Sequence, residues 1–446
     1  LKFYLRTMLR SLRNKLWLNP ISCRYYGTRI ERFDGQIENE KQRRRKLASL
    51  LPSDSMTIIS AARTLYMTND IPYPFRQNSN FYYLTGFEEP DAILLIDKKD
   101  SVETTKFILF VLPKDIEKER WHGIRVGWEN AHEYGSSESY PLTSFSNYFN
   151  SKIYEKNVLI VDEKPAQLDS VPNIPLQKAR EYLDPLRFIK SPQEIELAKK
   201  AASISNIGFR AIMKSSYPGI NEHLLNAELE WECRKNGAQR LAYPPVVAGG
   251  IRANTLHYIT NDKPINDGEL VLVDGGAELH CFCSDVSRTW PVNGKFTREQ
   301  AQIYQIVLAT LNECINECRR GTTINRIHSL SVNLLVQGLK SLGIINAHNN
   351  DYMKYYPHCI GHYLGMDVHD TSSMSYNQKL QPGTIVTIEP GLYIPKDPNF
   401  NPKYHGIGIR IEDNILITDS EPINLTKSIP KEIDEIEYLV KTRKSE

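Results

Sequence analysis

The sequence contains no run of about 18 consecutive apolar residues, and its mean hydropathy is negative. A membrane-spanning helix is therefore not expected. It also contains no CxxC pair, and the seven cysteines lie without regular spacing at positions 23, 233, 281, 283, 314, 318 and 359. This spacing argues against a disulfide scaffold or a structural zinc knuckle. Cys314 and Cys318 are one helical turn apart in an apolar stretch, so we expect two packed thiols there.

Acidic residues are missing from the start of the chain. Residues 1–30 hold seven Lys and Arg but no Asp or Glu, and leucines recur at positions 5, 9, 12 and 16. This pattern predicts an amphipathic basic helix, which is typical of a mitochondrial presequence; an ordinary surface helix is the alternative. We therefore predict a targeting presequence at residues 1–27 and a mitochondrial location, in the matrix or at the inner membrane.

The rest of the chain has an ordinary charge balance. It holds 48 Lys and Arg against 53 Asp and Glu, so its charge gives no reason to expect nucleic-acid binding. With 446 residues, of which 41% are hydrophobic and 24% charged, the chain is long enough for two globular domains.

Two domains are predicted from the order of the periodic segments. Residues 28–186 combine strand-like runs ("DAILLID", "TKFILFVLP") with the helical run "IENEKQRRRKLASLL", which predicts an α/β domain. At Ser191, "KSPQE" has the spacing of a helix-capping box, so we place the domain boundary just before it, near residue 186.

The second domain, residues 187–446, is predicted to have an α+β fold. Helical patterns are expected at about 192–215, 222–236, 297–320 and 323–342. They alternate with the strand-like runs "GELVLVDGG", "HCFCSDVSRTW", "TIVTIEPGLYI" and "GIRIEDNILIT".

A pair of carboxylates marks the first candidate site. Asp274 ends one apolar strand and Asp285 lies in the next, so a chain reversal between Leu279 and His280 would place them directly opposite each other. Two buried carboxylates repel each other, and a shared divalent cation offsets the repulsion. Alternatively, Asp274 starts a turn before the following glycines.

Further polar residues later in the chain favour the metal hypothesis. "HCIGHYLGMDVHD" supplies His358, His362 and His369, "TIEPG" puts Glu389 within an apolar strand, and "GIRIEDNIL" puts Arg410 and Glu412 on one face of another. A lone histidine is more often a packing residue, but these residues converge on one ligand class. The predicted ligands are four carboxylates and one imidazole, a set that suits two hard or borderline divalent ions: Asp274, Asp285, His362, Glu389 and Glu412.

This ordered set resembles the pita-bread metallopeptidases, which include methionine aminopeptidase, prolidase and aminopeptidase P. The motifs "RQNSNFYYLTGFEEPDA", "ERWHGIRVG" and "LHY" are most similar to aminopeptidase P, and the resemblance covers nearly the whole chain after the leader. It implies an aminopeptidase P-type N-terminal domain followed by a pita-bread catalytic domain.

The resemblance also implies roles for individual residues. Asp274 would bind one ion, His362 and Glu389 the other, while Asp285 and Glu412 would bridge both ions. A water or hydroxide between the ions would attack the scissile carbonyl, with Glu389 as proton acceptor. His257, His358 and His369 would hydrogen-bond the carbonyl or the oxyanion, and Tyr393 and Arg410 would be further active-site side chains. Manganese is the expected metal, with cobalt or zinc as alternatives.

The branch of the family and the substrate are predicted less directly. A fused N-terminal domain behind a mitochondrial-type leader resembles the intermediate-cleaving branch, which removes one bulky residue such as Tyr, Leu or Phe from imported proteins. Removal of a residue before proline is a second specificity of the same metal centre. A prolidase-type dipeptidase and a non-catalytic binding protein with this fold remain alternatives. By the same resemblance, at least a homodimer is expected.

Overall fold

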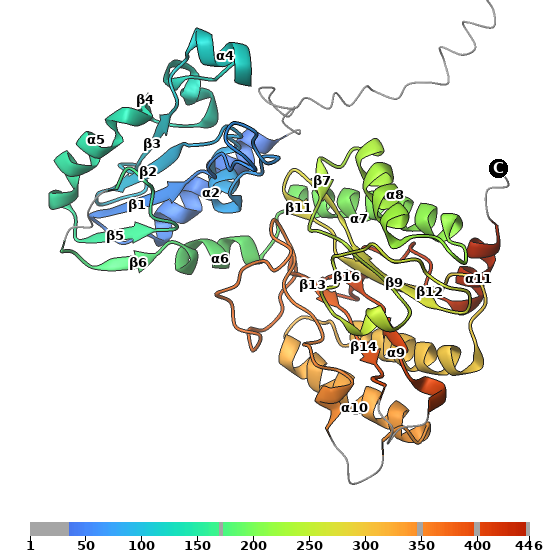
Figure 1. Ribbon diagram of the computed structural model, residues 1–446. Helices are drawn as coiled ribbons and strands as arrows, with labels where there is room; N and C mark the ends of the chain where they lie inside the picture. Colours follow the sequence, from blue (N-terminus) through green and yellow to red (C-terminus); the bar gives the residue numbers. More distant parts are fainter. Residues whose placement is uncertain (1–34, 169–172, 346–350, 397–401, 443–446) are drawn as a thin grey trace, which may run out of the picture.

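The computed structural model describes residues 35–168, 173–345, 351–396 and 402–442. The predicted presequence lies outside these ranges. Two bodies follow each other along the chain and are joined through helix α6 (Arg180–Phe188), as Figure 1 shows. Within the described residues, no helix is both long and apolar enough to cross a membrane.

The first body is a six-stranded mixed sheet covered by helices on both faces. The strand order is β4-β3-β2-β1-β5-β6, with β1 parallel to β5 and antiparallel to β2. Leu47 of α2 and Phe81 of α3 belong to one apolar cluster against the sheet, and Phe145 of α5 belongs to another. The elements are α2 (Gln36–Leu50), β1 (Ser55–Ser60), α3 (Ser79–Thr85), β2 (Ile93–Lys98), β3 (Lys106–Val111), α4 (Ile116–His122), β4 (Glu138–Pro141), α5 (Phe145–Lys152), β5 (Val158–Val161) and β6 (Leu176–Lys178).

The second body packs long helices around several short antiparallel sheets. The sheet orders are β11-β10-β7, β12-β9-β8, β13-β16-β17 and β14-β15. The helices are α7 (Pro192–Ser215), α8 (Glu222–Lys235), α9 (Arg298–Asn316), α10 (Ile324–Ser341) and α11 (Ile433–Lys441). The strands are β7 (Arg240–Leu241), β8 (Val246–Gly249), β9 (Leu270–Gly275), β10 (Ala277–Leu279), β11 (Phe282–Cys283), β12 (Val286–Pro291), β13 (Ile385–Ile388), β14 (Gly391–Tyr393), β15 (Gly408–Arg410), β16 (Asp413–Leu416) and β17 (Ile423–Asn424).

The predicted helices of the second body are confirmed. At the start of α7, the Ser191 hydroxyl accepts a hydrogen bond from the Glu194 amide, and the Glu194 carboxylate accepts one from the Ser191 amide at 2.6 Å. The expected packed thiols are also confirmed, because Cys314 and Cys318 are fully buried in the core. The predicted boundary at residue 186 falls inside α6.

Three predicted strands are each broken at a candidate ligand. β11 and β12 are separated at Asp285, β13 and β14 at Glu389, and β15 and β16 at Glu412. The predictions that Glu389 lies within a strand, and that Arg410 and Glu412 share one strand face, are therefore wrong. At Glu389 the reason is local, because the following Pro390 has no N–H for the ladder. In all three cases the chain leaves one small sheet and enters another.

The hairpin between the two aspartates also differs from the prediction. His280 and Cys281 have φ angles of 50° and 66°, so the reversal is centred one residue later than expected. Asp274 pairs with Ser287, and Asp285 is its diagonal rather than its direct neighbour. Gly276 allows this crossing, because a Cβ there would lie 1.7 Å from the Ser284 carbonyl oxygen.

Candidate metal centre

Three of the five predicted ligands meet in one buried cluster. One ligand atom each of Asp285, His362 and Glu412 lies within 4.8 Å of the others. The Nε2 atom of His362 is 3.3 Å from Oδ2 of Asp285 and 3.8 Å from Oε1 of Glu389, so the fourth ligand borders the same cluster. The structure thus brings together side chains that are up to 127 positions apart in the sequence numbering.

The fifth predicted ligand, Asp274, is connected to the cluster by a tyrosine. The hydroxyl of Tyr243 donates to Oδ1 of Asp274 at 2.5 Å and also contacts Oδ1 of Asp285. On its other side, Asp274 accepts a hydrogen bond from Nη2 of Arg410 at 2.7 Å. Sequence reasoning missed Tyr243, since a tyrosine before two prolines carries no signal that relates it to distant carboxylates.

Backbone pairing places His362 beside Glu389. The Thr387 amide donates to the His362 carbonyl at 2.9 Å, and the Glu389 amide donates to the Ile360 carbonyl at 2.8 Å. Gly361 permits this close approach, because a Cβ at this position would lie 2.0 Å from the Thr387 carbonyl oxygen.

The His362 ring is oriented by its other nitrogen. Its Nδ1 lies 3.1 Å from the Tyr363 carbonyl oxygen, which accepts a hydrogen bond from Nδ1–H and so directs Nε2 toward Asp285 and Glu389. Ser287 plays a related part for Glu412, since its hydroxyl donates to Oε2 of Glu412 at 2.9 Å and accepts from Nε of Arg410 at 2.8 Å.

The other predicted site residues surround this cluster. Arg410 donates to the Tyr393 hydroxyl at 2.7 Å, and that hydroxyl is 2.9 Å from Nε2 of His358. The His369 ring centroid is 4.3 Å from that of His362, and its side chain is exposed. His257 is exposed on the loop after β8, and a positive charge on its ring lowers the pKa values of both His358 and His369.

The cluster contains more carboxylates than positively charged groups that could balance them. Burial raises the pKa of Glu389 to about 7, although His362 and Arg410 lower it. Burial and the neighbouring Asp285 raise the pKa of Glu412 well above its usual range. Burial would lower the pKa of His362, but its hydrogen bond to Asp285 and that carboxylate's charge raise it to about 9. The protein alone therefore retains protons here that a cation would displace.

The donor set fits divalent metal ions. The Oε1 atom of Glu412 is buried and has no hydrogen-bond partner among the described residues, which is costly unless something else binds it. Four carboxylates with one imidazole are oxygen-rich ligands of the kind preferred by hard or borderline ions, and no cysteine of the described ranges joins the group of Asp285, His362 and Glu412. We conclude that these residues could hold such ions.

Comparisons with known proteins agree with this geometry. Residues 196–419 match the model of metallopeptidase family M24, and residues 41–161 match the aminopeptidase P N-terminal domain. Xaa-Pro aminopeptidase 3 of Homo sapiens is 42% identical over 428 residues, covering 89% of this chain and 84% of that protein. Intermediate cleaving peptidase 55, mitochondrial, of Arabidopsis thaliana is 41% identical over 425 residues, covering 93% and 83%.

Solved structures agree as well. Proline aminopeptidase P II from Yersinia pestis matches with a TM-score of 0.86 and 34% identity, over 91% of this chain and 99% of that one. The resemblance and the fold class predicted from the sequence are thus confirmed. The chain belongs to metallopeptidase family M24 and carries an aminopeptidase P-type N-terminal domain.

Proposed function

We propose that this protein is a dinuclear-metal aminopeptidase that releases a single residue from the N-terminus of peptides or proteins. The observation that carries the proposal is the buried cluster of Asp285, His362 and Glu412, whose ligand atoms lie within 4.8 Å of one another. The partnerless Oε1 of Glu412 supports a cation there.

The five predicted ligands would hold two ions, and manganese is the metal we propose. Asp274 would bind one ion, His362 and Glu389 the other, and Asp285 with Glu412 would bridge them. When bound, the ions would supply an acidified water as nucleophile and positive charge near the scissile carbonyl.

The surrounding residues would orient the substrate and move protons. Glu389, whose carboxylate lies beside His362 in the cluster, is suited to accept a proton from the nucleophile and to return it to the leaving amine. Burial and the Arg410 charge lower the pKa of His358 to about 3, so its ring is neutral. The exposed His257 and His369 would hydrogen-bond the substrate carbonyl at the mouth of the site.

For the substrate, we propose trimming of imported mitochondrial proteins by removal of one bulky residue. The basic, acid-free residues 1–30 support a mitochondrial location, as does the name of the Arabidopsis relative. Cleavage before proline is the second candidate, which the human relative's name supports. A homodimer or larger homo-oligomer is expected from the resemblance to the family.

Two other functions compete with this one. A prolidase-type dipeptidase would use the same ligands but would cut only dipeptides. A non-catalytic binding protein would have no reason to keep an excess of buried carboxylates around one imidazole, because their repulsion destabilises the fold.

Mass spectrometry of peptide cleavage tests the proposal. The manganese-loaded chain is incubated with peptides that begin Tyr-Gly, Leu-Ser and Ala-Pro, with Asp285→Ala as the control. Loss of Tyr or Leu alone supports presequence trimming, and loss of Ala alone supports cleavage before proline. If only dipeptides are cut, the prolidase alternative is correct, and if nothing is cut, the enzyme proposal fails.

A further inference from the structure

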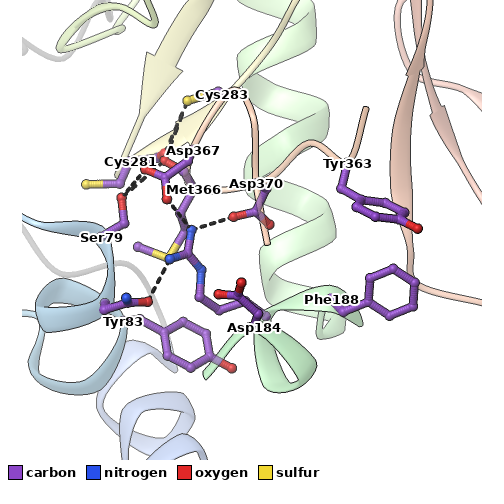
Figure 2. Close-up of polar contacts among 12 residues, drawn as sticks. Ser79, Tyr83, Asp184, Phe188, Cys281, Cys283, Tyr363, Met366, Asp367 and Asp370 are labelled. Atoms are coloured by element: carbon purple, nitrogen blue, oxygen red, sulfur yellow. Dashed lines mark hydrogen bonds and ion pairs between the residues drawn. The ribbon is translucent and has the colours of Figure 1, made fainter. Parts of the chain in front are cut away.

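A buried charge network joins the two bodies next to the candidate metal centre. Figure 2 shows its centre, where Asp367 of the second body approaches Ser79 of the first. The guanidinium of Arg187, in the linking helix α6, donates to Oδ2 of Asp367 at 2.6 Å and also contacts Oδ1 of Asp370. Only 4% of the Arg187 side chain is exposed.

The two carboxylates flank a predicted site residue. Asp367 lies two positions before His369 and Asp370 lies one position after it. One guanidinium therefore holds both ends of the short segment that carries His369, whose ring packs against that of His362. We name residues 365–371 the His369 loop.

The first body holds the same loop from its other side. The Ser79 hydroxyl donates to Oδ1 of Asp367 at 2.6 Å, and Arg76 donates to the Met366 carbonyl at 2.6 Å. The other Nη atom of Arg187 donates to Oδ1 of Asn80 at 2.7 Å. Arg187 thus connects helix α3 of the first body with the His369 loop.

The network does not have the form that stability alone would favour. Nε of Arg187 is buried and finds no hydrogen-bond partner in the described part of the chain, and an unsatisfied buried donor typically costs about 1–3 kcal/mol. Asp370 already has a second cation, because Nζ of Lys190 lies 3.1 Å from its Oδ2. What the second cation cannot supply is the link from Asp370 to Asp367 and Asn80.

We propose that Arg187 is a positioning residue: it fixes the His369 loop against the N-terminal domain and so sets where His369 lies beside the metal ligands. The inference rests on the proposed peptidase function as far as catalysis is concerned. It gives the N-terminal domain a part in a reaction whose ligands all lie in the other domain.

A second interdomain ion pair provides a matched control. Arg43 of α2 donates to Oε1 of Glu194 in α7 at 2.8 Å, and the two side chains are only 9% and 6% exposed. This pair is buried, as the Arg187–Asp370 pair is, but none of its described contacts involves the His369 loop. The variants to compare are Arg187→Gln, Arg187→Lys and Arg43→Gln in the full chain.

The first measurement is hydrogen–deuterium exchange of the metal-free protein. The Gly365 and Asp370 amides donate to the carbonyls of Asp367 and Tyr363. We expect faster exchange in peptides covering residues 363–371 for Arg187→Gln, less for Arg187→Lys, and no change there for Arg43→Gln. Unchanged exchange in both Arg187 variants overturns the proposal.

The second measurement is peptide hydrolysis by the loaded enzyme. A small displacement of a catalytic group costs on the order of 10- to 100-fold in rate, so Arg187→Gln should lower kcat to that extent while KM changes little. Added to His369→Ala, it should cause no further loss. An equal loss in Arg43→Gln, or an additive loss with His369→Ala, overturns the positioning role.

The two measurements separate this proposal from the proposed function. If the unsubstituted chain cleaves nothing, the peptidase function fails, whereas the exchange data still decide whether Arg187 holds the loop. If Arg187→Gln does not fold, Asp367→Asn replaces it, because the Asp367 side chain is 41% exposed and its change is better tolerated. Asp367→Asn should show the same faster exchange in peptides covering residues 363–371, and the proposal fails if it does not.

Discussion

Glu412 and Asp413 are consecutive and almost completely buried, yet their carboxylates lie in opposite environments. Asp413 accepts hydrogen bonds from Arg288 at 2.7 Å and Thr426 at 2.8 Å, and it also contacts Lys431. Burial would raise the pKa of Asp413, but Arg288 and Lys431 lower it to about 2. Glu412 has other carboxylates as neighbours, and its pKa is raised.

The difference shows that burial alone does not tell a structural carboxylate from a functional one. Both residues lose water to the same extent, and the neighbouring charges decide the sign of the shift. The Asp413 carboxylate is balanced by Arg288 and Lys431, so it needs no further cation. On the Glu412 side, the carboxylates outnumber the cations, so that side requires a cation from outside the chain.

The strongest test of this comparison is Glu412→Gln. The substitution keeps the shape of the side chain but removes a charge that the ions need. We expect kcat/KM to fall on the order of 10³-fold or more, since a metal supplies several kcal/mol of transition-state stabilisation. Metal content, measured by mass spectrometry of the purified protein, should fall with it. Full activity with two bound ions would contradict the assignment of Glu412 as a ligand.

Asp413→Asn should affect stability instead. Removing one partner of a buried ion pair leaves Arg288 and Lys431 uncompensated and typically costs about 3–5 kcal/mol. The measurement is urea unfolding in the presence of a chelator, with Glu412→Gln as the matched control. In that control the metal-free fold should lose little stability, because the raised pKa of Glu412 already favours its neutral form, which the amide resembles. Equal destabilisation by both variants would show that the two sides do not differ.

Tyr243→Phe should have an intermediate effect. Its hydroxyl donates to Asp274 and also contacts Asp285, and loss of such a partner of the ligands typically costs about 10- to 100-fold in metal affinity or activity. Manganese titration and peptide hydrolysis measure the two quantities. Tyr304→Phe is a control, since its hydroxyl donates to the Lys431 carbonyl away from the site. An equal effect of both changes would contradict a specific role of Tyr243 as a partner of the metal ligands.

A graded effect is expected in the pH dependence of metal binding. The pKa of Glu389 is raised from 4.5 to about 7, and that of His362 from 6.5 to about 9. The metal-free fold therefore holds extra protons, and the stability they contribute is lost as pH rises through 7 and 9. An ion must displace these protons, so its affinity should fall by about tenfold for each unit decrease in pH and for each proton displaced. Calorimetric titration with manganese should show a steeper fall below pH 7, and a constant affinity from pH 6 to 9 would contradict it.

Sequence patterns were sufficient for the helices of the second body. Helix α7 begins at the predicted capping box because its signals, Ser191, Pro192 and Glu194, act within one turn of chain. The candidate ligands were chosen from the resemblance of the whole ordered set, because no single spacing identified them. The assigned metal roles of these residues remain predictions.

Apart from the local effect of Pro390, the strand breaks and the register depended on contacts that local patterns do not contain. Apolar residues lie on both sides of Glu389 in "TIVTIEPGLYI", so the run was interpreted as one strand. The break arises where the chain passes from the β16 partner to the β15 partner. Likewise, the hairpin is centred on His280 and Cys281 because both adopt positive φ, which composition did not indicate for these residue types.

By itself, the sequence determined the helices of the second body and the order of the domains, because periodicity, capping and residue type act over short distances, and the resemblance of its ordered motifs supplied the candidate ligands. Only the tertiary structure decided that Tyr243 joins Asp274 to Asp285, that Arg187 reaches the His369 loop, and that Glu412 and Asp413 differ in charge environment. Each of these depends on side chains brought together from distant parts of the chain, and their electrostatic energies are set by burial and separation in space.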